Sequence, residues 1–262
     1  MIDHDNLEEF YDAANYDMQD ASDSGIAFYS ALAQESGGPV LEIACGTGRV
    51  SIPIARLGFT VTGLDIVPCM IEQARSKSSG LPTRWIVGDG RTFDLGEEYQ
   101  LIFLTGNAFQ CFLTNADQEA LLQRVYAHLS REGLFAFETR NPLFPHSQTP
   151  KGQLFVPLES TEEEQEWPPY INTNGHEVRV SRMYLYDHIA QIHHYKTFRR
   201  WAEGESEQAR VTRIALRYTF PQELAALLYY NGFEIDRQYG DWGLEPLTDG
   251  SPSIISVCRK RR

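Results

Sequence analysis

Between residues 39 and 140, short apolar runs alternate with segments that carry apolar residues at helical spacing. This alternation is typical of β-strands joined by α-helices. The strand runs are almost continuously apolar, which predicts parallel strands that are buried on both faces. The predicted strands occupy residues 39–44, 60–65, 84–89, 99–105 and 134–139. Together they predict a doubly wound α/β sheet.

Segments between and after these strands predict the rest of the sheet. Asn115 and Gln118 have the spacing of a capping box, and an apolar helical stripe follows them. Thr219 and Gln222 have the same spacing before a second stripe that ends at Gly232. Two final strands are expected at 233–239 and 253–258. The sequence therefore predicts a Rossmann-like, doubly wound and mostly parallel seven-stranded sheet.

Residues 142–218 interrupt the alternation. The stretch begins with a loop rich in proline and polar residues and continues with three runs of strand character, at 176–186, 189–201 and 209–220. We interpret it as an inserted antiparallel β subdomain, which acts as a substrate lid or a dimerisation element. The main domain is then formed by residues 1–141 and 219–262. Three consecutive glutamates at 162–164 are interpreted as a solvated charge run.

Charge and composition narrow the classes of partner. The chain has 262 residues with 23 Lys and Arg against 36 Asp and Glu, a formal net charge of −13. So acidic a surface repels phosphate backbones, which argues against nucleic acid as a partner. No apolar run approaches the roughly 20 residues that span a bilayer, and the acidic N-terminus lacks the apolar core of a secretory signal. We expect a cytoplasmic protein with no membrane partner.

The segment that joins the first predicted strand to the next helix reads Glu42-Ile43-Ala44-Cys45-Gly46-Thr47-Gly48. Its two glycines permit backbone conformations and a ligand approach that a Cβ would hinder. Asp65 ends the second predicted strand 19 residues after Gly46, where a carboxylate can accept hydrogen bonds from both hydroxyls of a ribose. The sequence therefore predicts a nucleoside cofactor at this position.

Two classes of cofactor share this pattern. In the dinucleotide pattern GxGxxG a third glycine allows tight helix packing beside a pyrophosphate, and here Ser51 stands in that place. Glu42 is an unfavourable neighbour for two phosphates, but it suits a ligand that carries an ammonium and a sulfonium. S-adenosylmethionine is therefore favoured, and a nicotinamide-dependent oxidoreductase is the alternative.

Four motifs carry a family resemblance: GGPVLEIACGTGRV, GLDIVPCMIEQAR, VGDGRTFDL and LTGNAFQCFLTNADQEALL. They resemble the successive motifs of class I S-adenosylmethionine-dependent methyltransferases. The chain is similar to the small-molecule subgroup with a β insert after the fifth strand, which includes sugar N-methyltransferases. The similarity extends to YDAANYD near the start and YGDWGLEPLTDGSPSIISV near the end, while Ala44 replaces the usual glycine. It implies transfer of a methyl group to nitrogen or oxygen of a small molecule (EC 2.1.1.-).

The resemblance also implies how individual residues contact S-adenosylmethionine. The expected contacts are Glu42, Ala44, Gly46 and Gly48 beside the methionine part, Asp65 at the ribose, Ile66 and Met70 flanking the adenine, Asp89 and Gly90 at the adenine edge, Thr105 at the methionine end, and Tyr11 and Tyr16 closing over the cofactor.

Methyl transfer from a sulfonium needs alignment and exclusion of water, and neither a nucleophilic side chain nor a metal. An acceptor that is protonated at neutral pH would also need a base, which the sequence does not single out. The candidates for a catalytic role are Asn107, Gln110, His146 and His194. Substrate contacts are expected from Asn107, Phe109, Gln110 and Arg140, which follow the fourth and fifth strands at the ligand-binding edge of the sheet. The alternatives are that Asn107 and Gln110 cap a short helix and that Phe109 belongs to the core.

The insert and the N-terminal segment are expected to select the acceptor. His193 and His194 are adjacent on a predicted strand, so at most one of them can face the cleft, and no metal site is predicted. Three aromatic residues of the insert, Trp167, Tyr170 and Trp201, either line a substrate lid or form the insert's own core. Its strand edges suit a homodimer. A noncatalytic cofactor-binding protein is a further alternative.

Overall fold

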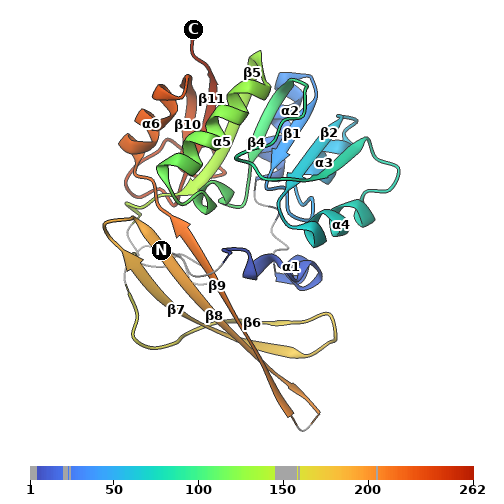
Figure 1. Cartoon of the computed structure of the whole chain (residues 1–262), viewed down its shortest axis with the longest axis vertical. Coiled ribbons are helices and arrows are strands. Elements are labelled where there is room, and N and C mark those ends of the chain that lie inside the picture. The colour runs from blue at the N-terminus through green and yellow to red at the C-terminus, as the bar shows by residue number, and fades with distance from the viewer. Residues whose placement is uncertain (1–4, 20–22, 24, 145–157, 159, 205) are drawn as a thin grey trace.

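The computed structural model describes residues 5–19, 23, 25–144, 158, 160–204 and 206–262. It contains two β-sheets (Figure 1). Sheet A has seven strands in the order β10-β11-β5-β4-β1-β2-β3, and sheet B has four in the order β6-β7-β8-β9. The expected α/β class, with a mostly parallel seven-stranded sheet and an added antiparallel sheet, is confirmed.

The elements have the following bounds. Sheet A consists of β1 (Val40–Ile43), β2 (Val61–Asp65), β3 (Thr83–Val87), β4 (Tyr99–Leu104), β5 (Leu129–Arg140), β10 (Phe233–Tyr239) and β11 (Ser253–Lys260). Sheet B consists of β6 (Gln165–Ile171), β7 (Glu177–Asp187), β8 (Ile192–Glu203) and β9 (Ser206–Arg217). The helices are η1 (Glu8–Phe10), α1 (Ala13–Gln19), α2 (Ile26–Ser36), α3 (Ser51–Arg56), α4 (Pro68–Lys77), η2 (Ala108–Cys111), α5 (Asn115–His128) and α6 (Pro221–Tyr230).

Sheet A is covered by helices on both faces. Buried residues of α5 and α6, such as Leu121 and Leu224, form one core with the sheet, and residues of α2 and α3, such as Tyr29 and Ile54, form the other. The pairs β1–β2, β1–β4, β2–β3 and β4–β5 are parallel, and β11 runs antiparallel to both of its neighbours in sheet A, β5 and β10. Because the parallel strands end at one edge, their loops converge there. Sheet B lies beyond this edge, with α1 between the sheets (Figure 1).

Some local expectations differ from the structure. The N-cap of α5 is Thr114, whose hydroxyl accepts from Asp117 N while Asp117 binds back, so the expected Asn115–Gln118 capping box is wrong by one residue. The strand β3 was expected to be buried on both faces, but it is the edge of sheet A, and only Trp85 of its residues is buried. Apolar side chains alone do not distinguish a central strand from an edge.

Sheet B has one more strand than the sequence predicted. Strand β6 contains Pro168 and Pro169, which cannot donate to a strand ladder, and its pairing with β7 shifts at this point. An edge strand tolerates both prolines. The glutamates at 162–164 are exposed, as expected of a solvated charge run, and Glu164 also forms a surface ion pair, with its Oε2 2.8 Å from Arg200 Nη1.

Both edges of sheet B carry features that hinder pairing with another chain. The prolines interrupt the β6 edge, and the Asn6 side chain occupies the β9 edge by bonding to Ala215 N (2.7 Å) and Ala215 O (3.1 Å). A homodimer through these edges stays a prediction. No helix in the described ranges is both long and apolar enough to cross a membrane.

Candidate functional site

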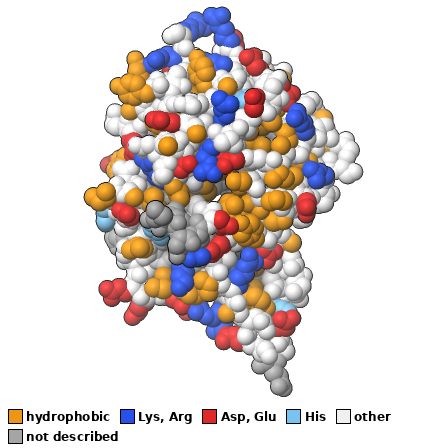
Figure 2. All heavy atoms as spheres, in the orientation of Figure 1, with side chains coloured by type: hydrophobic (Ala, Val, Ile, Leu, Met, Phe, Trp, Pro, Cys, Tyr) orange, Lys and Arg blue, Asp and Glu red, His pale blue; other side chains and the backbone are white. Residues whose placement is uncertain are grey.

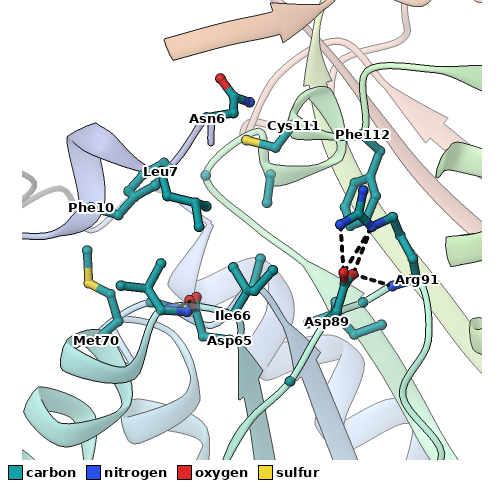
Figure 3. A pocket seen from close by; sticks show the side chains of 18 of the residues that line it. Asn6, Leu7, Phe10, Asp65, Ile66, Met70, Asp89, Arg91, Cys111 and Phe112 are labelled. Atoms are coloured by element: carbon teal, nitrogen blue, oxygen red, sulfur yellow. Dashed lines mark hydrogen bonds and ion pairs between the residues drawn. The ribbon is translucent and has the colours of Figure 1, made fainter. Parts of the chain in front are cut away.

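A cavity of about 360 Å³ opens at the carboxyl edge of sheet A. The loops after β1, β2 and β4 line it from one side, and the N-terminal segment (residues 5–19) lines it from the other (Figure 3). Hydrophobic side chains gather on the surface over this region between the two sheets (Figure 2). Ligands of open α/β sheets bind at such an edge. We refer to it as the cofactor cavity.

The loop after β1 leaves room for a ligand. Gly46 has a φ of 54°, and no heavy atom lies within 4 Å of the position that a Cβ would take there. Gly106, in the loop after β4, has a φ of 67° and equally open space. Both residues line the cofactor cavity, so side chains at these positions would fill it.

Asp65 fixes the loop after β1 to the end of β2. Its Oδ2 accepts a hydrogen bond from Gly46 N at 2.8 Å, and its Oδ1 accepts one from Val67 N at 2.9 Å. Burial raises the pKa of this carboxyl, while these backbone donors act to lower it. The carboxylate remains on the cavity wall, with 8% of the residue exposed. Asp65 is therefore a structural tie, and its carboxylate also lies where it can accept hydrogen bonds from a ligand.

The N-terminal segment closes the cavity by apolar packing. Leu7, Phe10 and Tyr16 pack with Val67 and Met70 at the start of α4. Figure 3 shows Leu7 and Phe10 opposite the loop after β2. The segment is joined to β9 of sheet B through Glu8, whose carboxylate accepts from Arg213 N at 2.9 Å.

A charged clamp borders the cavity at the end of β3. Three bonds from the Arg91 guanidinium reach the two carboxylate oxygens of Asp89 at 2.6–3.0 Å, and Arg91 Nη1 lies 2.9 Å from Asp117 Oδ1 on α5. Hydrogen bonding to Arg91 holds the pKa of Asp89 below its usual range. The clamp, seen beside Phe112 in Figure 3, ties β3 to the start of α5.

Glu138, a buried residue of β5, holds the loop after β4. Its Oε1 accepts from Thr105 Oγ1 and from Asn107 N, both at 3.2 Å, and Tyr29 Oη donates to its other oxygen. Burial raises the pKa of this carboxyl. Asn107 has a φ of 59°, in the left-handed region, so the carboxylate stabilises a tight corner at the cavity wall.

Comparison with known proteins matches this geometry. Residues 40–133 fit the model of the family described as a methyltransferase domain. The putative methyltransferase YqeM of Bacillus subtilis strain 168 is 25% identical over 226 residues, which is 84% of this chain and 81% of that protein.

Solved structures agree over nearly the whole chain. An S-adenosylmethionine-dependent methyltransferase from Clostridium acetobutylicum has a TM-score of 0.76 at 16% identity, and the match covers 94% of this chain and 96% of that one. The CcbJ methyltransferase from Streptomyces caelestis has a TM-score of 0.72 at 24% identity over 98% and 97%. CalS10 from Micromonospora echinaspora, an amino pentose methyltransferase with S-adenosylmethionine bound, has a TM-score of 0.68 at 19% identity over 92% and 94%.

Residues 40–133 form a methyltransferase domain, and the chain has the fold of class I S-adenosylmethionine-dependent methyltransferases. The family resemblance drawn from the four motifs is thereby confirmed, and S-adenosylmethionine is the cofactor of this methyltransferase. The nicotinamide alternative is set aside. In the described residues, no group of three or more His, Cys, Asp or Glu side chains is placed to hold a metal ion.

The cavity of the methyltransferase fits this cofactor. Asp65 offers a carboxylate to ribose hydroxyls, and Gly46 and Gly106 leave space where side chains would stand. Ile66 and Met70 give an apolar wall for a base. When bound, the cofactor supplies a methyl group on a sulfonium. The residues of the chain bind it, exclude water and align the acceptor.

Most positions expected to contact the cofactor line the cavity. They are Tyr16, Ala44, Gly46, Asp65, Ile66, Met70, Asp89, Gly90 and Thr105. Two of them have their polar groups engaged, because the Asp89 carboxylate is held by Arg91 and the Thr105 hydroxyl donates to Glu138. Their individual contacts with the cofactor stay predictions.

Three expected cofactor contacts lie off the cavity wall. Tyr11 is 49% exposed and its hydroxyl bonds to Asp5. Glu42 is fully buried beneath the loop and its Oε2 accepts from Ser51 N at 3.1 Å, so it supports the start of α3. A Cβ at Gly48 would lie 2.7 Å from the Trp85 ring, so this glycine is required for packing.

The sequence missed several cavity residues. Asn6, Leu7 and Phe10 come from the N-terminal segment, and Arg91 and Phe112 come from loops after β3 and η2. The spacing of Leu7 and Phe10, one helical turn apart, was a signal that could have indicated a short amphipathic turn there. Nothing in the sequence indicated that this turn packs against α4.

The expected substrate contacts fall outside the cofactor cavity. Phe109 has no exposed surface and stacks on Phe137 at 4.6 Å, so it is a core residue and the expected substrate contact is wrong. Gln110 is also fully buried and bridges Arg140 Nη1 (2.8 Å) to Arg217 O (3.2 Å). Asn107 begins η2 in the left-handed conformation without capping it through its side chain. Gln110 and Arg140 thus join sheet A to sheet B.

The alternation of side chains along β8 shows on which face of sheet B each of the adjacent histidines lies. His193 is fully buried among the rings of Tyr184, Tyr186, Tyr195 and Tyr218, on the face of sheet B that contacts Cys111 of η2. His194 points to the opposite face of β8, so the structure contradicts its candidacy. His146 lies outside the described residues.

Ala44 should be strained in its present position. Its φ of 56° lies in the left-handed region, which costs an alanine about 1 kcal/mol and glycine nothing comparable. We expect Ala44→Gly to raise the free energy of unfolding by about that amount, measured by urea denaturation. Ala55→Gly, within α3, should lower it by a similar amount. Equal destabilisation by both substitutions would contradict the strain at Ala44.

Proposed function

We propose that the protein methylates nitrogen or oxygen of a small-molecule acceptor that binds between the cofactor cavity and sheet B. One observation carries the proposal. Cys111 lines the cofactor cavity and also packs against a buried cluster on sheet B that contains Tyr184, Tyr195 and Leu216. The transfer site therefore adjoins an aromatic surface, which suits a small organic acceptor better than a polymer.

The polar groups of this cluster can orient an acceptor. The hydroxyl of Tyr184 is buried and has no hydrogen-bond partner among the described residues. Such a group is rare in a folded protein, and an acceptor bound beside it would supply the missing hydrogen-bond partner. The hydroxyls of Tyr195 and Tyr218 lie 3.3 Å apart. Burial raises the pKa of Tyr184 and of Tyr195, so both remain protonated and available as donors.

An amine acceptor fits the proposal best. An ammonium must lose a proton before it can attack the methyl group, so an amine acceptor has to reach the site in its neutral form or give its proton to a base there. Related folds support the choice: CalS10 is described as an amino pentose methyltransferase and KedS8 from Streptoalloteichus as a sugar N-methyltransferase. We therefore rank amines ahead of hydroxyl acceptors.

The proposal is tested with methyl-labelled S-adenosylmethionine and a panel of amino sugars, amino acids, other amines and phenols. We expect label in one acceptor class and a fall in kcat/KM of about tenfold in Tyr184→Phe, because one hydrogen bond is lost. Affinity for S-adenosylhomocysteine should not change. Tyr229→Phe, on exposed α6, is the matched control. Intact cofactor binding with no transfer to any panel member would favour a noncatalytic cofactor-binding protein.

A further inference from the structure

A second cavity, of about 240 Å³, lies on the other side of the N-terminal segment. Glu9, Asp12 and Asn15 of that segment line it, whereas Leu7, Phe10 and Tyr16 line the cofactor cavity. The two cavities share no residue among those the structure describes. The N-terminal segment is thus a wall between two separate cavities.

The floor of the second cavity is built by one face of sheet B. Arg199 of β8 is paired across the strands with Arg210 of β9, and both guanidiniums point into the space beneath the N-terminal segment. Arg199, of which only 7% is exposed, lies 2.6 Å from Glu9. Arg210 lies 2.8 Å from Asp12. Each cation is therefore held in place by an acid of the opposite wall.

The rest of the lining combines aromatic rings with amides. Tyr170 of β6 and Trp201 of β8 supply the rings, and Asn172 and Asn174 of the turn before β7 supply amide groups. The rings are only partly buried, so their surfaces are available to a ligand. The sequence left Tyr170 and Trp201 as either lid or core residues, and the structure places both at this cavity.

The balance of these groups indicates the chemistry of a ligand. Two guanidiniums and three carboxylates, with Glu203 as the third, favour neither a strong anion nor a strong cation. Hydroxyl groups match such a surface, because each one donates to a carboxylate and accepts from a guanidinium or amide. The aromatic rings suit the apolar face of a saturated ring.

We propose that the second cavity binds a neutral polyhydroxylated ring, either a free monosaccharide or one glycosyl unit of a larger molecule. The polar groups of the N-terminal segment and of sheet B bond to its hydroxyls, and Trp201 covers one of its faces. This site is independent of the proposed methyl acceptor.

The test is saturation-transfer NMR of methyl glucoside, methyl mannoside, methyl galactoside and myo-inositol with the full chain in the absence of cofactor. We expect transfer to the ring protons of at least one probe, and about tenfold weaker binding in Trp201→Ala. Trp201→Phe should retain most of the binding. Tyr230→Ala, at an 82% exposed aromatic residue of α6, is the matched control.

Two outcomes would overturn the proposal: no transfer from any probe, or equal transfer in Trp201→Ala and the wild type. Unchanged affinity of Trp201→Ala for S-adenosylhomocysteine would show that this variant is folded. Disaccharide probes distinguish the two sources of the ring. Binding as tight as that of the monosaccharide indicates a glycosyl unit, and loss on elongation at either end indicates a free sugar. Since no methyl transfer is measured, failure here and failure of the proposed function are separate results.

Discussion

Replacing Asp65 by alanine is expected to weaken binding of S-adenosylhomocysteine by about 3 kcal/mol, or roughly a hundredfold. The substitution removes the carboxylate that we expect to accept from the ribose hydroxyls. It also releases Gly46 N and Val67 N, which the carboxylate binds at 2.8 and 2.9 Å. Hydrogen bonds to a charged group are stronger than neutral ones. Losing them together should therefore cost more binding free energy than losing a single hydrogen bond at the surface. Calorimetric titration measures the change.

The controls for this experiment separate the ligand contact from the structural tie. Asp65→Asn keeps an oxygen that can accept from one backbone amide, so its affinity should lie between those of the wild type and Asp65→Ala. Asp249→Ala removes an exposed acid far along the chain and should not change affinity. An Asp65→Ala protein that binds the ligand as tightly as the wild type would show that Asp65 is not a cofactor contact.

Replacing Glu42 by glutamine is expected to stabilise the protein increasingly as pH rises. Burial raises the pKa of Glu42 to about 8, although bonds from Ser51 act in the opposite direction. Its Oε1 has no hydrogen-bond partner among the described residues. In the unfolded chain the carboxyl ionises near its ordinary pKa of 4.5. Between these values the folded state holds the extra proton, so wild-type stability falls as pH rises.

Glutamine cannot ionise, so the Glu42→Gln variant avoids this loss. The difference in unfolding free energy between variant and wild type should grow from pH 4.5 to pH 8 by about 5 kcal/mol, and remain constant above pH 8. Urea denaturation at a series of pH values measures it. Glu98→Gln, at an exposed glutamate, is the matched control. A flat profile for Glu42→Gln would mean that Glu42 is ionised in the folded protein.

Sheet A could be predicted because its determinants are local. Continuous apolar runs specify buried parallel strands. The glycine loop follows β1 and Asp65 ends β2, so the position of both can be recognised from the local sequence alone. The edge strand β6 was missed because Pro168 and Pro169 argue against a strand, and only its place in the sheet explains their tolerance.

The acceptor side of the site could not be predicted because it depends on contacts between distant segments. The sequence alone does not distinguish whether Phe109 contacts the substrate or belongs to the core. Its stacking on Phe137 in the structure shows that it is a core residue. Strand alternation showed that His193 and His194 face opposite ways, but only the cluster with Cys111 shows that His193 faces sheet A. Charged pairs such as Glu9–Arg199, 190 residues apart, leave no local signal.

The central claim is that the cofactor lies at the carboxyl edge of sheet A, between the loop at Gly46 and the N-terminal segment. A crystal structure with S-adenosylhomocysteine tests it most directly. We predict ribose hydroxyls within hydrogen-bond distance of the Asp65 carboxylate, the adenine beside Ile66 and Met70, and the homocysteine part in the space left open by Gly46 and Gly106. Density for the ligand at any other position, with this cavity empty, would contradict the account.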